Sequence, residues 1–138
     1  MAYCTKDDLD KLLPAQELLE LTADSGTSPD LTVINECINK AAAEIDSYLG
    51  LRYQVPFADV PARVQALAVD LAIYHLYSRR SVVPAVREKN YHQGLAFLRE
   101  VAAGKAVLGD GAEANRLTPR VDPSSAPRFF SRQKLVDY

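Results

Sequence analysis

The chain has few of the residues on which disulfide-rich and metal-binding proteins depend. Among its 138 residues are two cysteines, two histidines and no tryptophan. Cys4 and Cys37 are too few for a disulfide framework and do not form a C-x-x-C pair, so a secreted, disulfide-stapled fold is not indicated. Such thiols suit a reducing cytoplasm.

Long apolar runs are also missing. The most apolar stretch, residues 60–77, is interrupted by Arg63, Asp70 and His75, whose burial in lipid would be costly, so no membrane span is predicted. The first residues have neither a basic start nor an apolar stretch, and we therefore expect no signal peptide.

Motifs for catalysis and ligand binding are not found either. Neither His75 nor His92 neighbours a plausible nucleophile in sequence. Neither a pair of metal-ligating histidines or cysteines at a typical spacing nor a glycine-rich phosphate loop occurs. We expect a protein without metal or cofactor that is not an enzyme.

Helical periodicity is what the sequence has most clearly. Apolar residues recur at three- and four-residue intervals in residues 31–49, a stripe that includes Cys37 and predicts that this thiol lies in the core. Residues 62–78 are apolar in nearly all directions, which indicates a central helix. Residues 85–103 form a third helix, in which Gly94 indicates a close helix crossing or a bend.

Asp70 stands out within the central helix. An unpaired buried carboxylate is very costly, so Asp70 should either reach solvent or pair with Arg52 or Arg63.

Two short helices precede the main three. Thr5 and Asp8 resemble a capping box that starts the first, and Pro14 separates it from a second over residues 15–21. Turn-forming residues 22–30 predict an exposed loop. The fold class is therefore all-α: a small helical bundle domain over residues 1–104, followed by an extended C-terminal arm over residues 105–138, which is broken by glycines and prolines.

Charge is divided along the chain. Residues 1–50 carry 3 basic and 10 acidic side chains, a balance of -7, whereas residues 51–138 carry 13 and 8, a balance of +5. This division fits self-assembly, with the acidic part of one copy facing the basic part of the next, although a chance bias of a solvated surface gives the same numbers.

The C-terminal arm combines basic and apolar side chains. We expect it to dock on a neighbouring subunit in preference to its own bundle. The predicted partner and oligomer contacts are Arg116, Arg120, Arg128, Phe129, Phe130, Arg132 and Leu135.

Several segments together resemble a known family. They are Ala2-Tyr3-Cys4-Thr5 with Asp8-Leu9, residues 43–49, Arg52-Tyr53-x-Val55-Pro56, residues 68–80, and Phe130-Ser131-Arg132-x-x-Leu135. They are similar to small Mu-like prophage structural proteins, which in turn resemble the head-tail connector subunits of tailed phages. The resemblance implies a helical bundle braced by Tyr48, Arg52 and Tyr53, a ring of identical copies and an arm that engages neighbours.

Two functions compete. The first is a virion assembly protein, a neck or adaptor subunit that forms a homo-oligomeric ring, contacts portal, head or tail proteins, and lies in the host cytoplasm before it joins the virion. The alternative is a small helical nucleic-acid-binding regulatory module that uses Arg79, Arg80 and the basic arm. DNA contact is possible but not favoured, because no helix combines a basic face with a preceding turn as a helix-turn-helix does.

Overall fold

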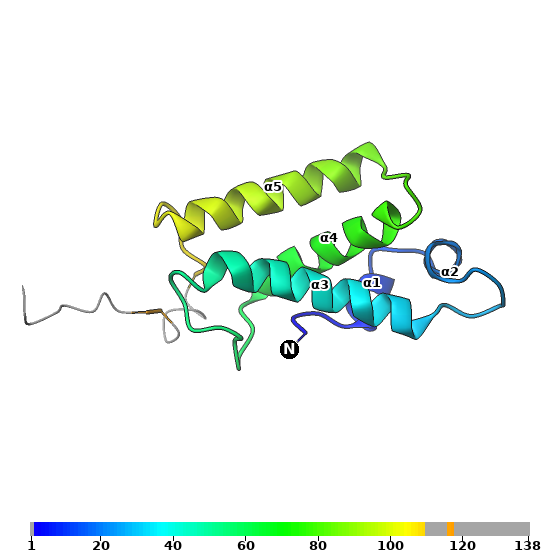
Figure 1. The fold of residues 1–138 in the computed structure, drawn as a ribbon, viewed down its shortest axis with the longest axis horizontal. Helices are drawn as coiled ribbons and strands as arrows, with labels where there is room; N and C mark the ends of the chain where they lie inside the picture. The colour runs from blue at the N-terminus through cyan, green and yellow to red at the C-terminus, as the bar shows by residue number, and fades with distance from the viewer. Residues whose placement is uncertain (1, 110–115, 118–138) are drawn as a thin grey trace, which may run out of the picture.

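The structure, a computed structural model, describes residues 2–109 and 116–117 (Figure 1). Within them the backbone forms α1 (Lys6–Asp10), α2 (Ala15–Thr22), α3 (Leu31–Leu49), α4 (Ala62–Ser78) and α5 (Ala85–Ala102). The described residues contain no β-strand, and the predicted all-α fold is confirmed. Helices α3, α4 and α5 run alternately in opposite directions, and the two short helices lie beside α4 (Figure 1).

Helix α4 is the centre of the bundle, as its apolar sequence predicted. It packs against α3, α5, α1 and α2. Val64, Leu71 and Leu76 are completely buried, and the opposing helices contribute Ile34, Ile45, Leu98 and other apolar side chains. Cys37 is also in this core, as expected from its place on the apolar stripe of α3.

Gly94 allows α5 to approach α4 closely. A Cβ atom at this position would lie 3.2 Å from Cδ2 of Leu67 and 3.3 Å from Cδ1 of Leu71. Since real Cβ contacts are rarely so short, the helices cross closely at this glycine, as one of the two predicted possibilities, and a Cβ there would require the two leucine side chains to shift by a few tenths of an ångström.

Local signals in the sequence set the helix ends. Asp8 accepts a hydrogen bond from the backbone N–H of Thr5 at 2.9 Å, which closes the capping box of α1. Asp30 caps α3 by accepting the N–H of Thr32 at 2.9 Å. Proline, whose fixed φ and missing N–H suit the residue before a first turn, precedes α2, α4 and α5.

The packed part of the chain continues past residue 104, where the bundle domain was expected to end. Gly104 has a φ of +79°, a left-handed conformation that favours glycine, and it reverses the chain after α5. Leu108 is then 6% exposed and belongs to the core. The first residues of the predicted arm therefore contribute to the bundle.

Candidate functional site at the base of the C-terminal arm

The predicted contact residues fall mostly outside the described part of the chain. Arg116 is described, and its place shows how the C-terminal arm is attached to the bundle. Outside the described residues lie Arg120, Arg128, Phe129, Phe130, Arg132 and Leu135.

Backbone pairing holds residues 116–117 against the connection between α3 and α4. Tyr53 and Arg116 form an isolated antiparallel β-bridge, and the N–H of Leu117 donates to the carbonyl oxygen of Arg52 at 2.7 Å. These residues lie at the end of the bundle where α3 and α5 finish (Figure 1). Residues 116–117 are thus held at a fixed point on the bundle.

Tyr53 supports this attachment point from inside. Its side chain is 3% exposed, and its hydroxyl accepts a hydrogen bond from the N–H of Leu108 at 3.4 Å. Its ring lies 6.0 Å from that of Phe57, which lies 6.0 Å from that of Tyr3. The Tyr3 hydroxyl donates to Asp46 and accepts from the N–H of Phe57. Burial raises the pKa of this hydroxyl well above the usual value for tyrosine.

Arg52 joins the segment between α3 and α4 to the end of α5. Its Nε donates to the carbonyl oxygen of Ala102 at 3.2 Å, a position that satisfies one of the carbonyls left free at the end of a helix. The guanidinium passes directly beside Gly104, where a Cβ atom would lie 2.7 Å from Nη2 of Arg52. Arg52 and Tyr53 therefore connect the segment between α3 and α4 to the end of α5 and to residues 108 and 116.

Asp70 is half-buried on α4, and Arg52 is not its partner. Burial raises the pKa of its carboxyl group, while the charges of Arg87 and Arg63 oppose that shift. Of the two arginines considered from the sequence, Arg63 is the one that lies near. Arg87, 17 residues further along the chain on α5, was missed because nothing local links the two positions.

An open groove of about 410 Å³ lies between α1 and α4. Its apolar lining comes from Leu12, Ala62, Ala66 and Val69, and it also contains the carboxylates of Asp8 and Asp70 and the ammonium group of Lys11. Lys11 contacts Asp8 at 3.2 Å, and Leu12 is 50% exposed. The groove therefore offers an apolar surface with charged groups at its edges.

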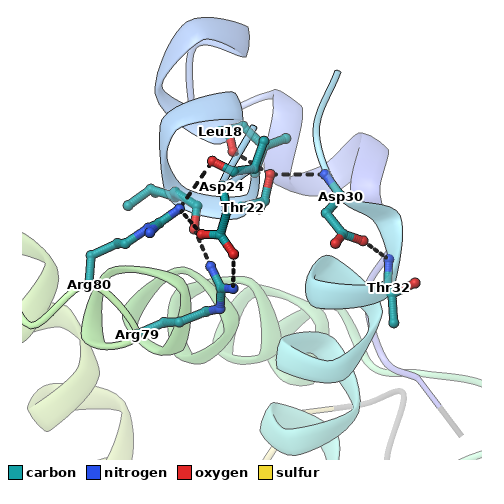
Figure 2. Close-up of polar contacts among 9 residues, drawn as sticks. Leu18, Thr22, Asp24, Asp30, Thr32, Arg79 and Arg80 are labelled. Atoms are coloured by element: carbon teal, nitrogen blue, oxygen red, sulfur yellow. Dashed lines mark hydrogen bonds and ion pairs between the residues drawn. The ribbon is translucent and has the colours of Figure 1, made fainter. Parts of the chain in front are cut away.

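Arg79 and Arg80, the residues of the nucleic-acid alternative, are occupied within the chain (Figure 2). Arg79 donates to the carbonyl oxygen of Leu21 and Arg80 to that of Ala23, each at 3.1 Å. Asp24 contacts both guanidinium groups, at 3.8 Å from Arg79 and 3.0 Å from Arg80. The two arginines tie the end of α4 to the loop after α2.

A polar cluster joins the three main helices. Glu44 on α3 contacts Nε2 of His75 on α4 at 2.9 Å and accepts the hydroxyl of Tyr91 on α5 at 2.7 Å. Tyr74 stacks on Tyr91 with ring centroids 3.8 Å apart. Burial lowers the pKa of His75 and raises that of Tyr91. The sequence did not predict this cluster, whose members lie on three different helices.

The described residues contain no group of three or more histidine, cysteine, aspartate or glutamate side chains placed to hold a metal ion. No helix among them is both long and apolar enough to cross a membrane.

Comparison with known proteins identifies the family of the chain. The family model described as Bacteriophage Mu, Gp36 matches residues 3–125. The chain belongs to the phage Mu Gp36 family. Within curated proteins, it is 35% identical over 82 residues to the Mu-like prophage FluMu protein gp36 of Haemophilus influenzae, an alignment that covers 59% of this chain and 57% of that relative. This Gp36-family chain is therefore a phage or prophage protein, as the resemblance implied.

Proposed function

We propose that this Gp36-family protein is a virion assembly protein, a head-tail connector subunit of the neck or adaptor type, and that it acts without catalysis through ring-forming protein–protein contacts. Membership of a phage Mu family is the observation that carries the proposal. Its partners are other copies of itself and the portal, head or tail proteins that adjoin the neck.

The distribution of charge supports contacts between copies. Residues 12–39 contain acidic side chains and no lysine or arginine. They form α2, the following loop and the start of α3, at the opposite end of the bundle from Leu117 (Figure 1). Residues 116–134, which follow the base of the arm, carry 5 basic side chains against 1 acidic one, a balance of +4. A head-to-tail contact between unlike ends repeats around a ring when its rotation closes.

The contacts of Arg79 and Arg80 support protein partners over nucleic acid. Phosphate binding by these side chains would compete with Asp24 and with two carbonyl oxygens of the same chain. A nucleic-acid-binding module would bind DNA most tightly at low salt, with a steep dependence on ionic strength. Because Arg79 and Arg80 are already occupied, we expect no DNA binding by this protein even at about 50 mM salt.

Removal of the arm beyond its attachment point tests the assembly role. Deletion of residues 118–138 keeps the hydrogen bond between Leu117 and Arg52, and the truncated chain should remain folded with an unchanged circular dichroism spectrum. We expect it to lose assembly at high concentration and on its portal partner, as measured by light scattering. Unaltered assembly would refute a role for the arm.

A second experiment tests the place of the protein in the particle. We expect phage particles made without its gene to show unjoined heads and tails, and purified wild-type particles to contain the protein by mass spectrometry. Particles that lack the protein, or that form normally without it, would contradict the connector role.

A further inference from the structure

The groove between α1 and α4 has an apolar surface that the bundle leaves open. Leu12 is half exposed at its edge, and Ala62 and Ala66 present small side chains beside it. Small residues next to a large exposed leucine form a depression into which bulky side chains can insert. Such a surface is typical of a peptide-docking site when the peptide carries apolar anchors.

Asp70 lies in the lining of this groove, and its carboxylate can accept further hydrogen bonds. Its carboxylate receives no hydrogen bond from any residue within 2–109 or 116–117. The neighbouring arginines are engaged elsewhere, because Arg63 lies over the ring of Phe97 at 4.5 Å and Arg87 donates to the carbonyl oxygen of Leu12 at 3.1 Å. A partly buried carboxylate of this kind gains from a new donor.

We propose that this groove receives residues 128–135 of a second copy of the chain, with Phe129 and Phe130 on its apolar surface and Arg128 or Arg132 donating to Asp70. The inference rests on the proposed connector function, which requires contacts between copies. Phe129-Phe130 is the one pair of adjacent aromatic residues in the sequence, and arginines stand on both sides of it. Each phenylalanine can bury about 150–250 Å² of surface.

Charge complementarity favours this segment as the occupant, and the proposed ring makes a second copy its source. From Leu117 to Phe129 an extended chain can span at most about 40 Å, so length alone permits both a neighbouring groove and the chain's own. The groove holds two carboxylates, Asp8 and Asp70, against one ammonium group, Lys11, whereas residues 128–135 carry Arg128, Arg132 and Lys134 and no acidic side chain. Contact between the groove of one copy and the segment of the next continues around a ring, whereas folding back would leave each copy closed on itself.

A matched pair of arginine substitutions tests the groove. Ala66 lines it on α4, and Ala43 is also an exposed helical alanine, on α3. In sedimentation experiments on the full chain at high concentration, Ala66→Arg should weaken self-association by about tenfold or more, as the loss of a central contact does. Ala43→Arg should leave self-association unchanged. Equal association of Ala66→Arg and the wild type would overturn the proposal.

Disulfide trapping identifies the occupant. Copies carrying Leu12→Cys are mixed with copies carrying Ser131→Cys, and the control replaces Leu12→Cys by Val107→Cys, which is 55% exposed and lies near the base of the arm. The native thiols Cys4 and Cys37 are buried, and burial raises the pKa of Cys4 to about 11, so they react slowly. We expect a covalent dimer in the first mixture and none in the control.

The outcomes separate this inference from the proposed function. A cross-link that forms only when Leu12→Cys and Ser131→Cys share one chain would show folding back, and no cross-link in either arrangement would also overturn the inference. If Ala66→Arg joins heads to tails as the wild type does, the groove assignment fails and the connector role stands. If purified particles lack the protein, the connector role fails.

Discussion

The hydroxyl group of Thr22 offers the sharpest test of how the short helices are held to the bundle. Thr22 is 1% exposed, and its Oγ1 donates to the carbonyl oxygen of Leu18 at 2.8 Å while accepting the N–H of Asp30 at 3.1 Å (Figure 2). The substitution Thr22→Val keeps the shape and removes both hydrogen bonds. Because the N–H of Asp30 loses its acceptor, we expect the free energy of unfolding to fall by about 1–2 kcal/mol.

Urea unfolding followed by circular dichroism measures this loss. With a slope of about 2 kcal/mol per molar urea, the midpoint should fall by roughly 0.5–1 M. Thr27 is exposed in the loop between α2 and α3, so Thr27→Val is the matched control and should change the free energy of unfolding by less than about 0.5 kcal/mol. Equal midpoints for the two variants would refute the argument that the buried hydroxyl holds α2 to the start of α3.

Further predictions concern titrating groups and the end of α5. Burial lowers the pKa of His75, so as pH falls through about 6.5 this imidazole is protonated in the unfolded chain before it is protonated in the folded one, and the free energy of unfolding should fall. His75→Gln should therefore reduce the difference between urea midpoints at about pH 7.5 and pH 5.5. Burial raises the pKa of Asp70, so its charge costs stability at neutral pH; Asp70→Asn should raise the urea midpoint while weakening self-association, and a lower midpoint would contradict the burial argument. Gly104→Ala forces a left-handed alanine against the guanidinium of Arg52 and should lower the free energy of unfolding by about 1–2 kcal/mol, from the backbone strain and the displaced side chain together. A loss below about 0.5 kcal/mol in urea unfolding would contradict this account.

Local sequence signals predicted the helices well. The expected ranges 31–49 and 62–78 coincide with α3 and α4, and the other main helix differs by a single residue at its end. Apolar periodicity shows which face of a helix is buried, and proline and glycine show where it can begin or end. These properties depend on neighbours within a few residues, which is why one sequence is sufficient to predict them.

The contacts that build the candidate site could not be predicted in this way. Arg79 and Arg80 were considered as phosphate-binding groups, and their partner Asp24 is more than fifty residues away in the chain. Arg52 was one of two candidate partners for Asp70, yet it reaches the end of α5. Such partners depend on how helices dock, which a pattern of residue types along the chain does not encode.

The hydrogen bond between Leu117 and Arg52 has a consequence for the order of assembly events. It fixes where residues 118–138 begin, and an extended chain from Leu117 to Phe130 spans at most about 45 Å. In the proposed ring, this segment of one copy would meet the next position at an effective concentration in the millimolar range. Contacts between copies that are too weak to form dimers in dilute solution would then close a ring readily once a template had gathered the first few copies.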